Sequence, residues 1–116
     1  MPPNGSGAGA ISGIKINSGK TNVAIKNLTV QLFNGLNGNS DGGIYASGGN
    51  NNLTVDNVAL LNNSNGSGLY ANGPVNNVSV TNSMVAGHLT GARGIVIWNG
   101  LKSNINISNN IITNNN

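Results

Sequence analysis

Short runs of alternating apolar and polar residues recur along the chain every 25 to 30 positions. Each run opens with a glycine and an aliphatic residue, at Gly13-Ile14, Gly43-Ile44, Gly68-Leu69 and Gly94-Ile95. A second alternating pair follows ten or eleven residues after each glycine, namely Val23/Ile25, Leu53/Val55, Val78/Val80 and Ile105/Ile107. A third apolar position comes at Val30, Leu60, Val85 and Ile112. Alternation with period two predicts strands, and the Gly, Asn and Ser clusters between the runs predict turns.

Repeats of this length indicate a solenoid, in which each repeat forms one coil and the coils stack along an axis. The pattern predicts an all-β parallel β-helix of about four coils, starting near Gly13, Gly43, Gly68 and Gly94. Residues 13–116 then form one β-helical domain, preceded by a flexible leader or a partial N-terminal coil in residues 1–12. The first repeat carries a longer final turn, residues 34–42, which we expect to loop out.

Asparagine occupies fixed places in this repeat. One set lies immediately before the second strand, at Asn22, Asn52, Asn77 and Asn104. Another lies just after it, at Asn27, Asn57, Asn82 and Asn109. In stacked coils, equivalent residues lie about 4.8 Å apart, so the side-chain amides of each set can hydrogen-bond into a ladder. Asparagine also tolerates the left-handed backbone of a tight corner, and both sets are therefore predicted to form Asn ladders at the corners.

The fourth repeat shows the frame most clearly, with Gly94-Ile95-Val96-Ile97 followed by Asn104-Ile105-Asn106-Ile107-Ser108-Asn109. This frame resembles the right-handed parallel β-helix repeat of pectate-lyase-like proteins and of the carbohydrate-binding and sugar-hydrolase β-helix superfamily. The resemblance covers nearly the whole chain, from about Gly13 to Asn115. It implies a right-handed coil, and it says little about activity, because this repeat is a scaffold onto which functional sites are added.

Composition agrees with a scaffold of this kind. The 116 residues include 26 Asn and 18 Gly, which disfavour a helical protein, and 30 Leu, Ile, Val and Phe, enough to disfavour disorder. There is no cysteine for a disulfide or a thiolate metal site, and a net charge of +3 from so few charges is too sparse for a nucleic-acid-binding surface. No apolar run is long enough for a membrane-spanning helix, and the start of the chain lacks the features of a secretory signal.

Catalytic chemistry has few candidate residues. Asp41 and Asp56 are the only acids, and the coil pattern separates them, so neither a paired-carboxylate site nor a calcium cage is expected. His88 is the single histidine and is predicted to be a polar turn residue. Lys26 and Asp56 fall on one external row in adjacent coils and are predicted to pair. We therefore expect no enzymatic activity, no metal and no cofactor.

The sequence contains one candidate ligand-binding surface, formed by aromatic side chains. The alternation places Tyr45 and Tyr70 on one external row, and Asn72 and Trp98 on the next row across. Flat rings beside amides suit a carbohydrate platform, whereas a cross-strand aromatic ladder that only stabilises the sheet uses the same arrangement. The small polar rows Thr54/Ser79/Asn106 and Asp56/Thr81/Ser108 also resemble, more weakly, an ice-binding face.

The ends of the predicted solenoid suggest its role. The chain stops at Asn114-Asn115-Asn116, directly after the third strand of the fourth coil and without a capping helix. An uncapped coil exposes core residues and strand edges, which can stack head to tail into a filament. The sequence therefore predicts a non-catalytic structural module that binds copies of itself, outside the cell or at its surface. The alternative is a carbohydrate-binding or carbohydrate-processing β-helix fragment, with a polysaccharide as its partner.

Overall fold

The computed structural model describes residues 12–33, 42–89 and 92–116 of the chain. The strands are β1 (Ser12–Ile16), β2 (Thr21–Gln31), β3 (Gly42–Ala46), β4 (Asn50–Leu61), β5 (Ser67–Asn72), β6 (Val75–Thr81), β7 (Met84–Ala86), β8 (Ile95–Trp98), β9 (Lys102–Ser108) and β10 (Ile111–Thr113). All the strand pairings are parallel, and the described residues contain no helix. Within them, no segment is therefore a helix that could span a membrane.

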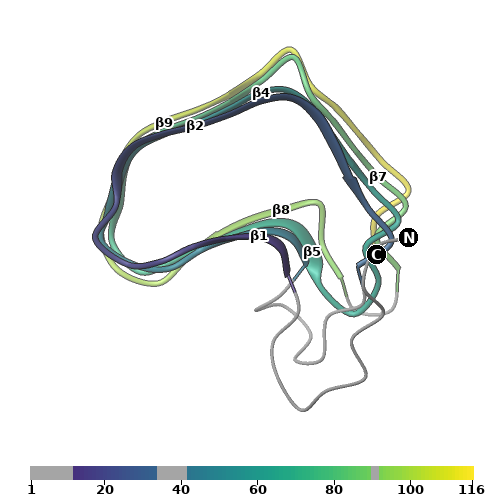
Figure 1. Ribbon diagram of the computed structural model, residues 1–116, viewed down its shortest axis with the longest axis horizontal. Helices are drawn as coiled ribbons and strands as arrows, with labels where there is room; N and C mark the ends of the chain where they lie inside the picture. The colour runs from purple at the N-terminus through teal and green to yellow at the C-terminus, as the bar shows by residue number, and fades with distance from the viewer. Residues whose placement is uncertain (1–11, 34–41, 90–91) are drawn as a thin grey trace.

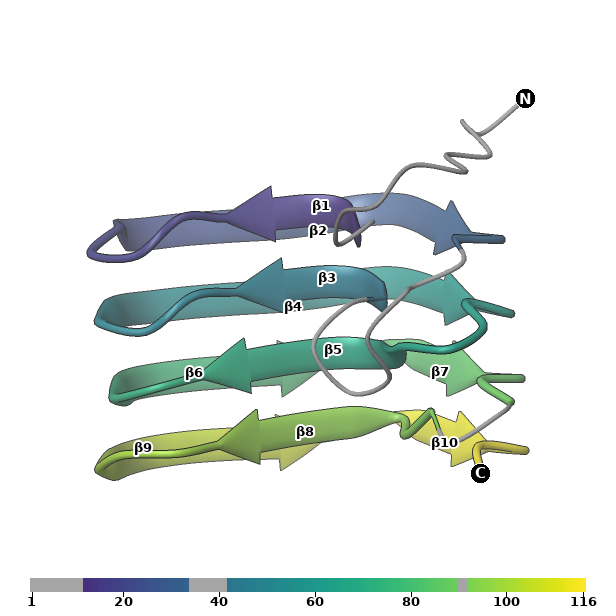
Figure 2. The same ribbon diagram turned by 90° about the horizontal axis from the view of Figure 1, so that it is seen from below.

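The strands form two sheets that wrap around a common core. One sheet has four strands in the order β1-β3-β5-β8, and the other contains β2, β4, β6, β7, β9 and β10. Figure 1, viewed along the stack, shows the coils nearly superimposed, and Figure 2 shows the four layers one above another. In Figure 1 the N-terminal coil lies nearest to the viewer, and the chain turns clockwise from β1 to β2. Because each later coil lies further from the viewer, the solenoid is right-handed. The predicted fold class is confirmed.

The predicted register is confirmed strand by strand. The repeat-opening aliphatics pair in one column, Ile14, Ile44, Leu69 and Ile95. The second-strand aliphatics pair in another, Val23, Leu53, Val78 and Ile105. The third apolar position forms a column of Val30, Leu60, Val85 and Ile112. These columns face the interior, and in the two central coils they are almost fully buried.

The glycine that opens each repeat is required by close packing between coils. A Cβ atom on Gly68 would lie 2.6 Å from Cγ1 of Val85 and 2.7 Å from the carbonyl oxygen of Gly94 in the next coil. Such distances are shorter than van der Waals contact, so the backbone of the next coil could not keep its position. The same close approach recurs at Gly13 and Gly43, where an added Cβ would lie 2.8 and 2.7 Å from a carbonyl oxygen of the next coil.

The second and third strands differ among the coils. They run together without a break in β2 and β4, whereas the third coil separates β6 from β7 and the fourth separates β9 from β10. At the corner of the third coil, Ser83 directs its backbone N–H to Oδ1 of Asn110, at 2.9 Å, in place of a backbone carbonyl. At the equivalent position of the first two coils, Leu28 pairs with Val58, and the Val58 N–H donates to Oγ of Ser83 at 3.1 Å.

Parts of the predicted loop and leader lie outside the described residues. These are residues 1–11 of the leader, residues 34–41 of the long turn, and Asp41 within that turn. Gly42, predicted to end the turn, is the first residue of β3.

Candidate functional site

The aromatic surface lies on the outer side of the four-stranded sheet. Tyr45 of β3 pairs with Tyr70 of β5, and their rings stack with centroids 5.9 Å apart and planes 9° from parallel. The ammonium group of Lys15, on β1, lies 6.0 Å from the centroid of the Tyr45 ring. One row across, Asn72 pairs with Trp98 of β8. The structure thus brings together the four residues that the sequence singled out, in the predicted register.

The accessibility of these rings differs. Tyr70 is 7% exposed, and burial, with a smaller contribution from Tyr45, raises the pKa of its hydroxyl. Trp98 is 63% exposed, and Tyr45 is partly exposed. The burial of Tyr70 favours the role of a stacking residue within the sheet, whereas Trp98 offers an open ring to a partner.

The first Asn column forms a continuous ladder. Nδ2 of Asn52 donates to Oδ1 of Asn22 at 2.8 Å, Nδ2 of Asn77 donates to Asn52 at 2.7 Å, and Nδ2 of Asn104 donates to Asn77 at 2.7 Å. All four residues have a left-handed backbone, with φ between 52° and 57°. Each amide therefore points its donor toward the preceding coil and its acceptor toward the next one.

The second Asn column has the same corner backbone but a different hydrogen-bond pattern. Asn27, Asn57, Asn82 and Asn109 all have φ between 50° and 57°. Nδ2 of Asn57 donates to Oδ1 of Asn27 at 2.8 Å, as predicted. Nδ2 of Asn82, however, donates to Oδ1 of Asp56 at 2.9 Å, because the carboxylate on the adjacent position is a stronger acceptor than an amide.

Asp56 is the centre of a small polar cluster on the outer face of β4. Its Oδ1 also accepts a hydrogen bond from the Thr81 hydroxyl at 2.9 Å, and its Oδ2 lies 3.8 Å from Nζ of Lys26. The hydrogen bonds from Asn82 and Thr81 lower the pKa of this carboxyl group, with a further contribution from Lys26. The predicted ion pair is present, and it lies within the register of the sheet rather than in a cleft.

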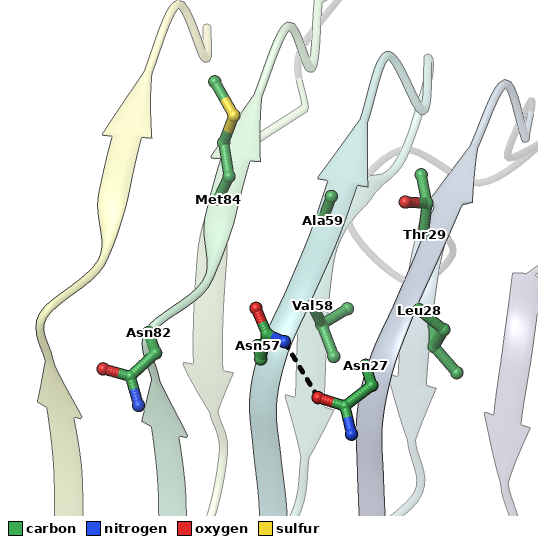
Figure 3. A pocket seen from close by; sticks show the side chains of 8 residues that line it. All are labelled: Asn27, Leu28, Thr29, Asn57, Val58, Ala59, Asn82 and Met84. Atoms are coloured by element: carbon green, nitrogen blue, oxygen red, sulfur yellow. Dashed lines mark hydrogen bonds between the residues drawn. The ribbon is translucent and has the colours of Figure 1, made fainter.

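A groove of about 290 Å³ runs over the corner beside this cluster. Figure 3 shows the amides of Asn27, Asn57 and Asn82 on neighbouring coils, with Thr29 and Met84 further along the chain. The remaining lining residues are Leu28, Val58 and Ala59. None of the lining side chains titrates or acts as a nucleophile at ordinary pH, so the groove can hold a surface ligand but supplies no acid or base chemistry.

A polar column inside the solenoid was missed by the sequence interpretation. It contains Asn63, His88 and Asn115, each three residues after the third apolar position of its coil. Asn63 accepts a hydrogen bond from the backbone N–H of Phe33 and donates to the carbonyl of Val30. Asn115 makes the equivalent bonds to His88 N–H and the Val85 carbonyl. The constant spacing from the apolar position was a signal that could have revealed this column.

His88 takes the place of asparagine in that column and is fully buried, so its prediction as a polar turn residue missed its interior position. Its Nδ1 lies 3.3 Å from the backbone N of Asn63, and its Nε2 lies 3.0 Å from the carbonyl of Leu60. A neutral ring with the proton on Nε2 satisfies both, accepting at Nδ1 and donating at Nε2. Burial lowers the pKa of His88, and two backbone carbonyls oppose that shift, that of Asn63, 3.1 Å from Nδ1, and that of Leu60 at Nε2.

The C-terminal coil exposes its inward-facing aliphatic side chains. Ile105 is 38% exposed, Ile107 44% and Ile112 48%, although they continue columns that are buried in the inner coils. Of the corresponding residues of the first coil, Val23 is partly buried, and Ile25 and Val30 are 7% and 5% exposed. The apolar face at the C-terminal end, which we call the terminal face, is defined by Ile105, Ile107 and Ile112.

The fold and these features define a right-handed parallel β-solenoid with asparagine-lined corners. Among the described residues, no three His, Cys, Asp or Glu side chains gather as metal ligands. No protein-family model, curated protein or solved structure matches the chain.

Proposed function

We propose that this protein is a non-catalytic structural solenoid that associates end to end with copies of itself through the terminal face. The observation that carries the proposal is the exposure of Ile105, Ile107 and Ile112 on columns that are buried in every inner coil. A further coil placed there removes these side chains from water at about 25 cal/mol per Å² of apolar surface. It also pairs the free edges of β8, β9 and β10.

The polarity of the first Asn ladder supports head-to-tail rather than head-to-head contact. Oδ1 of Asn104 points toward the terminal face, and Nδ2 of Asn22 lies at the opposite end of the ladder. Neither atom has a hydrogen-bond partner within residues 12–33, 42–89 and 92–116. Stacking the first coil of one copy on the last coil of another joins this donor to this acceptor. Such a heterologous contact repeats without closing and produces a filament.

Two neighbouring isoleucines of β10 provide a matched test. Ile112 belongs to the terminal face, whereas Ile111 pairs with outward-facing Met84 and is 61% exposed. Ile112→Lys places a charge in the proposed contact and is expected to leave the protein monomeric. Ile111→Lys adds the same charge outside the contact and is expected to associate like the parent. Sedimentation velocity over a range of concentrations measures the association, and electron microscopy measures its form.

The outcomes separate the alternatives. Particles that lengthen along the solenoid axis with concentration support the proposal. A dimer that grows no further contradicts the head-to-tail mode, and a parent protein that stays monomeric at high concentration contradicts self-association altogether. Circular dichroism of both variants distinguishes a lost contact from a lost fold. We assign the module to the extracellular space or the cell surface, on the scarcity of charge and the resemblance of its repeat.

A second candidate function is carbohydrate binding, as in the pectate-lyase-like superfamily that the repeat resembles. It is supported by the open indole ring of Trp98, opposite Asn72 on the neighbouring strand. Affinity electrophoresis with a panel of plant and microbial polysaccharides tests it. Trp98→Ala should abolish any retardation, while Leu101→Ala, at an 85% exposed position nearby in the chain, should leave it unchanged. Equal loss in both variants would exclude a specific role for the indole ring.

A further inference from the structure

The turn between β8 and β9 contains an asparagine followed directly by glycine, Asn99-Gly100. Both residues are exposed and left-handed, with φ of 61° and 77°. In any Asn-Gly pair, the glycine nitrogen can attack the asparagine side-chain carbonyl carbon, because glycine has no side chain to obstruct it. The local structure decides whether that nitrogen is free to react.

In the equivalent turns of the second and third coils, a glycine N–H donates a backbone hydrogen bond. Gly49 N–H donates to the Pro74 carbonyl at 2.8 Å, and Gly73 N–H donates to the Trp98 carbonyl at 2.9 Å. Each bond runs from one coil to the next coil along the chain. Gly100 lies in the last coil, and its N–H has no acceptor in the described part of the chain. Its nitrogen is therefore accessible where the others are held.

Lys102 adds a positive charge at the same peptide unit. Its ammonium group donates hydrogen bonds to the carbonyl oxygens of Asn99 and Gly100, the second at 2.9 Å, and to that of Gly73 at 3.0 Å. The Asn99 carbonyl and the Gly100 nitrogen belong to one amide group. When that nitrogen loses its proton, the negative charge is shared with the carbonyl oxygen. An ammonium group on the oxygen stabilises this anion, as fixed donors do in an oxyanion hole.

We propose that Asn99-Gly100 is a site of spontaneous deamidation promoted by Lys102. The Gly100 nitrogen gives its proton to water and bonds to Cγ of Asn99. The Cγ–Nδ2 bond breaks, and the side-chain nitrogen leaves with a proton from water as ammonia. Water then opens the resulting succinimide at either carbonyl, giving aspartate or isoaspartate. The reaction does not require self-association, and it places a new carboxylate at the end of the solenoid.

The chain contains its own control. Asn72-Gly73 occupies the preceding coil, but the Gly73 nitrogen is already a hydrogen-bond donor to Trp98. No ammonium group contacts the Asn72 carbonyl within residues 12–33, 42–89 and 92–116. Breaking one backbone hydrogen bond slows the reaction by about a factor of ten, and the missing positive charge slows it further. Asn99 should therefore convert at least about ten times faster than Asn72.

The experiment is peptide mapping by mass spectrometry after incubation of the dilute protein near neutral pH. The parent should accumulate aspartate and isoaspartate at position 99 well before position 72. Lys102→Met should slow conversion at Asn99 about tenfold, since it removes a charged hydrogen bond to the reacting amide. Lys20→Met removes the same charge from the equivalent turn of the first coil and should leave the rate unchanged.

Each result bears on the proposal. Equal rates at Asn99 and Asn72 in the parent, or an unchanged Asn99 rate in Lys102→Met, would overturn it. If Lys102→Met merely loosened the fold, the rate at Asn72 would rise as well, so that position reports on folding within the same sample. Slower conversion at Asn99 with an unchanged rate at Asn72 supports the assignment.

Discussion

Asparagine serves two physical purposes at the corners of this solenoid. It adopts the left-handed backbone that most residues avoid by about 1 kcal/mol or more, and its amide bonds to copies of itself in adjacent coils. Asn52 and Asn77 do both, since each accepts one ladder bond and donates another. A third corner column, Leu32, Asn62, Gly87 and Asn114, shares the left-handed backbone without a uniform residue type. Backbone conformation is thus the common requirement, and the ladder is an additional source of stability.

The two contributions can be separated at Asn77. Asn77→Gly retains the left-handed backbone and loses both ladder bonds, so we expect a loss of about 1 to 2 kcal/mol of unfolding free energy. Asn77→Ala loses the same bonds and also strains the corner, so we expect a further loss of about 1 kcal/mol. Urea denaturation followed by circular dichroism measures both variants. Equal stability of the two would show that the corner conformation contributes nothing.

His88 makes the stability of the fold depend on pH. The ring is neutral in its buried site, and its folded pKa is below the ordinary value of about 6.5. Below that value the unfolded chain binds a proton that the folded chain does not, so stability falls as the pH drops from about 6.5 toward the folded pKa. The groups packed on the ring come from Asn63, Leu60 and Gly68, none of which titrates.

His88→Asn is expected to remove this dependence. Asparagine already makes the equivalent bonds at Asn63 and Asn115 in the same column, so the variant should fold. The midpoint of thermal unfolding, measured between neutral pH and about pH 5, should fall in the parent and remain flat in the variant. A parallel fall in both proteins would assign the pH dependence to another group. Asp56, whose pKa is lowered, affects stability only at more acidic pH, below its ordinary value.

Each strand in this protein is specified by columns of equivalent residues in the stacked coils rather than by its own segment alone. The alternation predicted the register of the aliphatic pair in each second strand correctly, because one face of each strand must be buried against the core. It did not identify Val58 and Val75, which are buried in β4 and β6 as well. The continuity of β4 through its corner, and the break between β6 and β7, were not predictable in this way. They accompany a change in pairing at the corner, where Leu28 pairs with Val58 but the Ser83 N–H donates to the side chain of Asn110 in the adjacent coil.

The glycine that opens a strand should tolerate no side chain. Gly68→Ala brings a methyl group against Val85 and the Gly94 carbonyl, so we expect a loss of about 3 kcal/mol. Gly19→Ala is the comparison, because it meets no atom within 4 Å and is affected only by its φ of 71°. For that variant we expect a loss of about 1 kcal/mol. Chemical denaturation of both variants measures the difference, and equal losses would contradict the packing argument.

The whole molecule is asymmetric along its axis. Its C-terminal coil exposes aliphatic side chains of the core, while in the N-terminal coil Ile25 and Val30 of the same columns are nearly buried and Val23 is partly buried. This difference gives the solenoid one apolar end. End-to-end association and the chemistry of Asn99 are both proposed for that end, since Gly100 lies in the C-terminal coil and the N–H groups of Gly49 and Gly73 in the preceding turns each donate to the next coil.

The two proposals together predict that assembly protects Asn99. A stacked coil would supply a carbonyl acceptor for Gly100 N–H, as Pro74 does for Gly49. Deamidation at Asn99 should therefore slow by about tenfold in concentrated, assembled protein and not in monomeric Ile112→Lys at the same concentration. Peptide mapping of both samples measures the rates. If the rates are equal although the parent has assembled, the contact lies elsewhere than on the terminal face.

The sequence by itself determined the repeat, the strand register and the positions of the corners. These are encoded locally, in alternation with period two and in asparagines that accept a left-handed backbone. Only the tertiary structure decided which polar groups become partners across coils. It placed His88 in the core as a substitute for asparagine, directed Asn82 to Asp56, and left Gly100 without an acceptor among the residues that the structure describes. Those outcomes depend on residues 25 to 30 positions away, whose relative placement exists only once the coils have stacked.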